Sequence, residues 1–379
     1  MTEEYLASAK VYETENIGKM SILDMLAYFE EKGAMRVSDL HIKIGAPPTY
    51  RIDGDLVKLK GQKVTTEIAR QLIYPLLSNE NLNKFQSQYS VDCSYRYGSL
   101  QFRINIFQEN DGICAAIRAL SMDIPDVEKI GFPNTIWEDV IDRKQGLVLL
   151  TGITGAGKST TIASLIDRIS QKRACRIITV EDPIEYIFQQ KYSIISQREL
   201  GRDVKSFIDG LRAMLREDPD VIFVGEMRDP ETIAMTLMAA ETGHLVFSTL
   251  HTRDATGTVT RILDYFSADR QNEVRNQLSL GLAYIICQKL IPKKDGKGRI
   301  VAMEILNNKH YACANLIRTG KIEQLYSQLQ TKTKNKPDEN MITMESHLAR
   351  LVKQDKIDLL EAKKWANNLN SFIDAMQRT

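Results

Sequence analysis

Short apolar runs recur through the second half of the chain, and each ends in polar or charged residues. The runs are 146–150 (GLVLL), 176–180 (RIITV), 221–224 (VIFV) and 245–250 (LVFSTL). After the first run, Ile162, Leu165, Ile166 and Ile169 recur on one face of a helical pattern. Apolar strands that alternate with helices predict an open, doubly wound parallel sheet, that is, an α/β fold.

The first part of the chain has a different pattern. Apolar residues from Ile22 to Phe29 recur at helical spacing, which predicts a helix that packs into a core. Polar and apolar residues alternate in three other runs, as in strands that are buried on one face. These runs are 40–42, 50–52 and 102–106. The pattern predicts a separate domain that mixes helices and strands.

A chain of 379 residues is long enough for two domains, each with its own core. We expect an N-terminal domain at 1–120, which includes a short N-terminal extension. A linker at 121–129 contains Pro125, and a larger α/β domain follows at 130–379. Within the larger domain, residues 331–340 (TKTKNKPDEN) predict a loop, and two helical patterns follow it.

The composition argues against several kinds of function. The formal net charge is +1, so the chain lacks the basic excess that binds nucleic-acid backbones. Its longest apolar run, 281–287, is too short to span a bilayer, and the N-terminus has no signal-peptide pattern. The five cysteines never form a C-x-x-C pair, so we expect no zinc site. We expect a soluble protein of the reducing cytoplasm that does not bind nucleic acid.

Residues 152–159 (GITGAGKS) match the P-loop pattern G-x-x-x-x-G-K-[ST], between an apolar strand and a helical pattern. Backbone N–H groups of such a loop point at the β- and γ-phosphate oxygens of a nucleotide. Lys158 adds a positive charge, and the Ser159 hydroxyl is placed to bind Mg²⁺. A Gly-rich structural turn is the alternative, but the strand and helix around the loop favour a phosphate site. The residues expected to bind the nucleotide are Gly152, Thr154, Gly155, Ala156, Gly157, Lys158, Ser159 and Thr160.

Three more polar blocks stand at the ends of the later strands. The second strand ends in an acidic cluster at 181–186 (EDPIEY), at the sheet edge where open parallel sheets bind ligands. The third ends in 225–229 (GEMRD), where Glu226 would face a metal ion. The fourth is flanked by His244 and His251. Each block alone also fits a solvated turn or a structural histidine.

Together, the four blocks resemble the Walker A, Asp box, Walker B and His box of the secretion ATPase superfamily, which powers type II secretion and type IV pili. The resemblance extends to 38–42 (SDLHI), 50–54 (YRIDG) and 315–318 (NLIR), so it covers nearly the whole chain. The chain is most similar to the PilT/PilU group of pilus-retraction motors. We expect it to lack the extra N-terminal domain and the zinc site of assembly-type members.

The resemblance implies a PAS-like N-terminal domain followed by a RecA-like P-loop ATPase domain. It implies a homohexamer that hydrolyses ATP, with Mg²⁺, to drive pilus retraction. The implied partners are the other subunits of the ring, the pilus platform protein of the inner membrane and a paralogous pilus motor. The protein would then lie in the cytoplasm, at the inner membrane.

The resemblance also implies roles for single residues. Glu185 would orient or deprotonate the attacking water, and Glu226 would hold Mg²⁺ directly or through a water molecule. His251 would sense the γ-phosphate, and His244 would support the site. From the residues alone, an acid after a strand equally fits a structural role.

Two arginines of the first domain, Arg103 and Arg118, match positions where family members send arginines into the neighbouring subunit's nucleotide site. A guanidinium supplied in this way can stabilise charge on the transferring γ-phosphoryl group. From the residues alone, both arginines also fit solvated positions on strands. The catalytic role requires contact between subunits, which a closed ring provides.

The chain departs from the autonomous retraction motors at 312–314 (ACA), where those motors carry an A-I-R triplet. Residues 266–270 and 295–299 look more like the PilU branch, whereas 225–232 looks like the PilT branch. An accessory ring that docks on another motor and hydrolyses little ATP is therefore an alternative. A RecA-like nucleic-acid translocase would share the ATP site, but it should show a basic stripe, which the charge balance does not favour.

Overall fold

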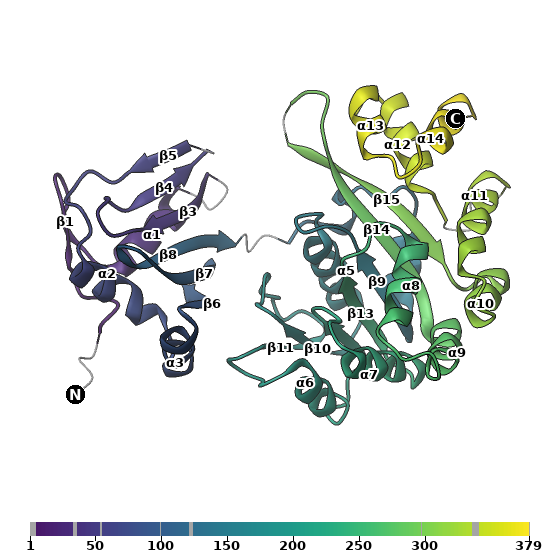
Figure 1. Cartoon of the computed structure of the whole chain (residues 1–379), viewed down its shortest axis with the longest axis horizontal. Helices are drawn as coiled ribbons and strands as arrows, with labels where there is room; N and C mark the ends of the chain where they lie inside the picture. The colour runs from purple at the N-terminus through teal and green to yellow at the C-terminus, as the bar shows by residue number, and fades with distance from the viewer. Residues whose placement is uncertain are drawn as a thin grey trace. The chain divides into compact units, whose positions relative to one another are not determined.

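In a computed structural model (Figure 1), the chain folds into two compact units. One consists of residues 1–123 with 183–187, and the other of 124–182 with 188–379. The structure describes residues 5–32, 36–53, 55–98, 100–120, 124–296, 298–335 and 341–378, without the side chains of 120 and 331–335. In this described part, no helix is both long and apolar enough to cross a membrane.

The first unit is built on an antiparallel sheet with the strand order β5-β4-β3-β8-β7-β6. A separate two-stranded sheet, β1-β2, precedes its first helix. The elements are β1 (Tyr12–Thr14), β2 (Gly18–Met20), α1 (Ile22–Lys32), β3 (Val37–Ile42), β4 (Thr49–Ile52), β5 (Asp55–Lys58), α2 (Thr66–Ile73), η1 (Tyr74–Leu76), α3 (Asn79–Gln88), β6 (Ser90–Tyr97), β7 (Leu100–Glu109) and β8 (Gly112–Leu120).

One face of this sheet forms the core of the first unit. The helix predicted from Ile22 is confirmed as α1, which buries Met25 and Phe29 among the side chains on that face. In the sheet, Leu40 and Ile117 are fully buried on the same side. Because side chains alternate along a strand, the polar residues between them lie on the opposite face.

The second unit contains a seven-stranded sheet with the order β11-β10-β12-β13-β9-β14-β15, in which only β15 is antiparallel to its neighbour. The predicted doubly wound parallel sheet is therefore confirmed. The elements are η2 (Val127–Lys129), α4 (Ile136–Asp142), β9 (Gly146–Thr151), α5 (Lys158–Lys172), β10 (Arg176–Glu181), β11 (Ile194–Glu199), α6 (Phe207–Met214), β12 (Val221–Val224), α7 (Pro230–Glu241), β13 (Leu245–Leu250), α8 (Ala255–Asp264), α9 (Gln271–Gly281), β14 (Leu282–Pro292), β15 (Arg299–Asn307), α10 (Tyr311–Arg318), η3 (Ile322–Gln324), α11 (Leu325–Asn335), α12 (Met344–Lys353), α13 (Leu359–Trp365) and α14 (Leu369–Arg378).

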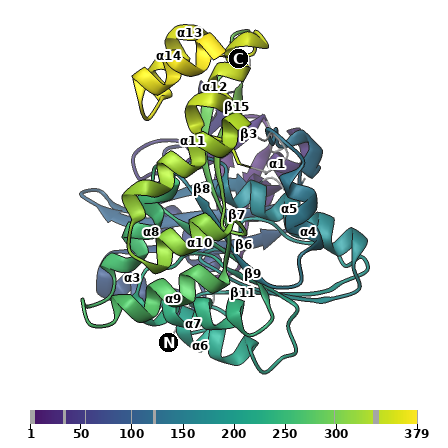
Figure 2. The same cartoon turned by 90° about the vertical axis from the view of Figure 1, so that its right-hand side faces the viewer.

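Helices cover both faces of this sheet, which is why its central strands are mostly apolar. All residues of β9, β12 and β13 are buried. Figure 2 shows α6, α7 and α9 on one side of the sheet and α4 and α5 on the other. The predicted start of α7 is also confirmed, because the Asp229 side chain accepts a hydrogen bond from Thr232 N at 2.8 Å and Pro230 is the first helical residue.

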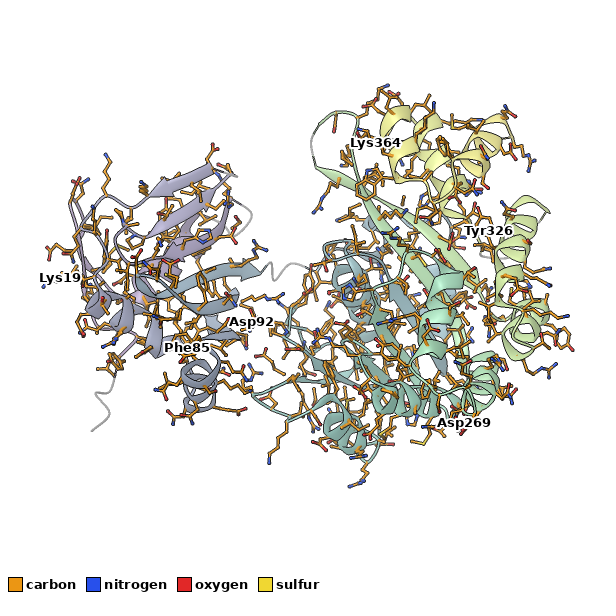
Figure 3. The ribbon with its side chains drawn as sticks, in the orientation of Figure 1. Lys19, Phe85, Asp92, Asp269, Tyr326 and Lys364 are labelled. Atoms are coloured by element: carbon orange, nitrogen blue, oxygen red, sulfur yellow. The ribbon has the colours of Figure 1, made fainter. Side chains whose placement is uncertain are left out.

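Two expectations for the C-terminal part are wrong. Residues 331–335 of the predicted loop instead belong to α11, which continues to Asn335, and residues 336–340 lie outside the described part. Three helices, α12 to α14, follow instead of two. Tyr326 on α11, labelled in Figure 3, donates a hydrogen bond to Glu345 Oε2 on α12 at 3.2 Å, which ties α11 to these helices. Of the predicted linker, 121–123 lie outside the described residues, and Val127–Lys129 form the short helix η2.

A carboxyl group lies inside the second unit, away from solvent. Glu304 on β15 is 1% exposed and stands directly opposite Cys287 on β14, which in turn stands opposite Thr151 on β9. Its Oε1 accepts a hydrogen bond from Ala255 N, in the first turn of α8, at 2.8 Å. Burial raises the pKa of Glu304 from 4.5 to about 7, against the opposing effect of that hydrogen bond.

We predict that Glu304→Gln stabilises the protein at alkaline pH. The native state binds a proton on Glu304 more tightly than the unfolded state does, so this residue's contribution is fully present below pH 4.5 and is lost as pH rises through about 7. The difference between the two pKa values corresponds to a loss of at most about 3 kcal/mol in the free energy of unfolding. Urea unfolding at pH 5 and pH 8 measures it: the gain from Glu304→Gln should appear at pH 8 and be small at pH 5. An equal effect at both pH values would contradict the prediction.

Candidate active site

The P-loop leaves β9 where the chain passes directly against the backbone of β14. Gly152 has a φ of +145°, and a Cβ there would lie 2.5 Å from the carbonyl oxygen of Gln288. Only glycine fits such a close approach. Gly157, with a φ of +87°, occupies the N-cap position of α5. These two glycines turn the chain from the strand into the helix, so that the loop wraps the helix N-terminus.

Lys158 is the first residue of α5, and only 8% of it is exposed. Its ammonium donates hydrogen bonds to the carbonyl oxygens of Gly152 at 2.8 Å and Ile153 at 3.2 Å. The positive charge is thus held at the start of the loop. Thr154 and Gly155 are exposed, while Ser159 and Thr160 are half-buried in the first turn of α5. The eight predicted nucleotide-binding residues therefore follow one another along a single loop and helix turn.

Charged side chains meet at the carboxyl ends of three neighbouring strands, β10, β12 and β13. Glu226 Oε2 lies 2.8 Å from Arg228 Nη2, and its Oε1 lies 3.4 Å from His251 Nε2. Arg228 Nη1 also lies 3.4 Å from Asp182 Oδ2, after β10. Because β9 is the next strand beside β13, this cluster and the P-loop share one edge of the sheet. The structure thus brings the predicted Glu226 and His251 together.

Arg228 is a candidate site residue that sequence reasoning missed. The hydrogen bond from its guanidinium to Glu226 raises the pKa of Arg228, with a further contribution from the charge of Asp182. Its position two residues after Glu226 was visible in the sequence, but an arginine after a strand usually lies in solvent. Arg228 is part of the cluster because it contacts two carboxylates, Asp182 and Glu226, which follow different strands.

A cavity of about 390 Å³ adjoins the start of the P-loop. Its lining includes Gly152 and Ile153, Lys289 of β14, Trp365 at the end of α13, and Asn367 between α13 and α14. The Lys289 ammonium donates to the Trp365 carbonyl at 2.6 Å and to Asn367 Oδ1 at 2.5 Å, and burial lowers the pKa of Lys289. The C-terminal helices are therefore fixed against the strand that borders the P-loop.

His244 is not at this edge. It precedes β13, and its carbonyl accepts a hydrogen bond from Gly146 N at the start of β9. Six residues of strand separate it from the P-loop, a distance of about 20 Å. Its Nδ1 lies 2.9 Å from the Ala239 carbonyl, so the ring caps the C-terminal end of α7. The structure therefore places His244 at the opposite end of β13 from His251, away from the P-loop of its own chain.

The other predicted residues belong to the first unit. Glu185 is half-buried in the loop after β10, within 183–187, and none of the described residues forms a hydrogen bond or ion pair with it. Arg103 on β7 and Arg118 on β8 stand directly opposite each other in the antiparallel sheet. Their action at a nucleotide stays a prediction.

Comparison with known proteins identifies the family. A family model described as type II/IV secretion system protein matches residues 22–365. The chain belongs to this family. The type IV pilus retraction ATPase PilT of Pseudomonas aeruginosa is 42% identical over 313 residues, 82% of this chain and 89% of PilT. A twitching motility protein of Neisseria gonorrhoeae is 40% identical over 326 residues, 86% of each chain.

Two solved ATPase structures have the same overall fold as this chain. The crystal structure of the pilus retraction motor PilT with bound ADP has a TM-score of 0.82 and 43% identity, and the match covers 94% of this chain and 99% of that one. The ATPase DotB of Legionella pneumophila has a TM-score of 0.80 at 26% identity, covering 91% and 95%. These matches confirm the predicted fold, an N-terminal domain followed by a RecA-like ATPase domain.

His251 should support ATP hydrolysis, whereas His244 should support the stability of the fold. We predict that His251→Ala lowers ATP hydrolysis about 10- to 100-fold without unfolding the protein, because it removes a polar group beside Glu226. His244→Ala should cost about 1 kcal/mol of stability, seen as a fall in Tm of a few degrees, and leave hydrolysis nearly unchanged. Hydrolysis assays and thermal unfolding of both variants test this. A folded His244→Ala variant as inactive as His251→Ala would contradict the placement.

Proposed function

We propose that this protein is an ATP-driven motor of type IV pilus retraction that works as a homohexameric ring. The observation that carries the proposal is the P-loop at the same sheet edge as Glu226 and His251, in a chain similar to PilT along nearly its whole length. Membership of the secretion family makes the chain an ATPase. The ring would work at the cytoplasmic side of the inner membrane.

The phosphates of ATP would bind to the backbone N–H groups of the P-loop, at the N-terminus of α5. Lys158 would then exchange the carbonyl oxygens of Gly152 and Ile153 for phosphate oxygens. The Ser159 hydroxyl and the Glu226 carboxylate are hard oxygen donors of the kind that Mg²⁺ prefers. When bound, Mg²⁺ would neutralise charge on the phosphates. Glu226 would first have to release Arg228, which then faces Asp182 alone.

Hydrolysis would also need a positioned water and charge neutralisation from outside the P-loop. The Glu185 carboxylate, which has no ion-pair partner among the described residues, would orient or deprotonate the water. Arg103 and Arg118 would stabilise charge on the γ-phosphoryl group of the neighbouring subunit. Contacts of this head-to-tail kind close into a ring or run on as a filament, and we propose the ring.

We propose that the ring acts on the pilus through the inner-membrane platform protein, and that it works beside a paralogous motor. One observation favours the accessory role as a second candidate. Ala314 on α10 stands at the arginine of the A-I-R triplet of autonomous motors, and it is half-buried. PilU of Pseudomonas aeruginosa is 34% identical over 356 residues, 93% of this chain and 90% of PilU. In that role, hydrolysis would depend on the partner motor.

We predict that Glu185→Gln separates binding from chemistry. The amide keeps the size of the side chain but cannot accept the proton of the water, so hydrolysis should fall at least about 100-fold while ATP and Mg²⁺ still bind. Nucleotide binding and turnover are measured on the same preparation. Mixing Glu185→Gln with Arg103→Ala subunits should restore part of the activity, at junctions where an intact arginine meets an intact glutamate. Equal loss of binding and turnover, or no rescue after subunit exchange, would contradict the assignment.

Deletion of the gene in its host tests the cellular function. If the protein is an autonomous retraction motor, the deletion strain should carry more surface pili and should not twitch. The wild-type gene should restore twitching. A Lys158→Ala variant should not, because its P-loop lacks the positive charge that binds phosphate. An accessory ring predicts that Lys158→Ala restores part of the twitching, provided that the partner motor is active. Unchanged pilus number and twitching would count against both roles.

A further inference from the structure

Four charged residues form a row across the polar face of the N-terminal sheet. Arg51 on β4 stands opposite Asp39 on β3, Asp39 opposite Arg118 on β8, and Arg118 opposite Arg103 on β7. Directly paired residues of antiparallel strands point to the same face, with Cβ atoms about 5 Å apart. Arg51 and Arg118 both approach the Asp39 carboxylate, whereas Arg103 stands beyond Arg118, and the formal charges of the four residues sum to +2.

Asp39 is the buried member of the row. It is 6% exposed, whereas the side chain of Arg118 is 66% exposed. Asp39 Oδ1 accepts a hydrogen bond from Arg118 Nε at 2.7 Å, and Oδ2 accepts one from the Ser38 hydroxyl at 2.7 Å. Arg51 Nε lies 3.7 Å from Oδ2. Burial opposes ionisation, but Ser38 and Arg118 outweigh it, so the pKa of Asp39 lies below its usual value.

The geometry of this pair decides which atoms of Arg118 remain available. Asp39 binds Nε, and the terminal Nη groups of Arg118 make no hydrogen bond to any described residue. A guanidinium held in this way presents two N–H groups side by side, which matches two oxygens of a phosphate. Arg103, directly opposite, is exposed. Two like charges opposite each other are unfavourable in a sheet, and an anion bound between them would remove the repulsion.

We propose that Asp39 is a positioning residue, which holds Arg118 through Nε so that its Nη groups and the Arg103 guanidinium bind the terminal phosphates of a nucleoside triphosphate. The inference rests on the proposed function, in which these arginines act at a neighbouring subunit's nucleotide. Asp39 itself touches no phosphate. It removes the rotational freedom that Arg118 would otherwise lose on reaching the transition state. Its effect should therefore fall on kcat more than on KM.

The test replaces Asp39 with Asn in the full-length ring and measures kcat and KM for ATP hydrolysis. We expect kcat to fall about tenfold, the scale of a lost orienting contact, with KM changed less than threefold. Asp92→Asn is the matched control, because Asp92 (labelled in Figure 3) lies on the same face of the same sheet, opposite Asn105 instead of an arginine. This control should keep wild-type kcat.

A double-mutant cycle with Arg118→Ala separates positioning from a structural role. Because Asp39 acts through Arg118, adding Asp39→Asn to Arg118→Ala should change kcat less than twofold. A tenfold loss that persists without Arg118, or an Asp39→Asn variant with wild-type kcat, would overturn the inference. If Asp39→Asn does not fold, Asp39→Glu, which keeps the charge but moves the carboxylate, goes through the same cycle. Wild-type kcat in Arg118→Ala would instead refute the arginine role in the proposed function.

Discussion

The site depends on the close backbone contact between Gly152 and Gln288, where the chain leaves β9 beside β14. No side chain fits between the two strands at this point, because a Cβ on Gly152 would lie 2.5 Å from the Gln288 carbonyl oxygen. The turn that follows brings the Gly152 and Ile153 carbonyls within reach of the Lys158 ammonium. A larger residue at 152 would push β9 and β14 apart and displace the whole loop. The phosphate site is therefore a consequence of strand packing.

The order of the parallel strands supplies the rest of the edge. Asp182, Glu226 and His251 follow β10, β12 and β13, which are neighbours in the sheet although far apart in sequence. Arg228 links the first two of these residues, and His251 approaches Glu226 from the strand next to the P-loop. The same logic holds in the first unit, where strand register alone aligns Arg103, Arg118 and Asp39. In both units, pairing of strands sets the charge pattern.

The sequence predicts most of this fold because its central strands are short, mostly apolar runs and because apolar residues recur at helical spacing after the first of them. It also predicts the P-loop and names Glu226 and His251 as site residues, since all of them follow strands closely; that these two side chains lie beside each other comes from the structure. It grouped His244 with His251, because a strand pattern does not tell which of two flanking histidines lies at the ligand edge; the structure places them at opposite ends of β13. The roles of Arg228 and Asp39 depend on partners from other strands, which no local pattern encodes. The extension of α11 to Asn335 was missed because the segment is polar, and polarity alone does not end a helix.

The central claim is that the P-loop binds a nucleotide and that phosphate replaces the loop's own carbonyl oxygens around Lys158. A crystal or cryo-electron-microscopy structure with a non-hydrolysable ATP analogue and Mg²⁺ tests it most directly. We predict phosphate oxygens at the Lys158 ammonium, the metal ion near Ser159 and Glu226, and Arg228 turned away from Glu226. A nucleotide bound elsewhere, or a Lys158 that still donates to Gly152 and Ile153 with the analogue present, would contradict the account.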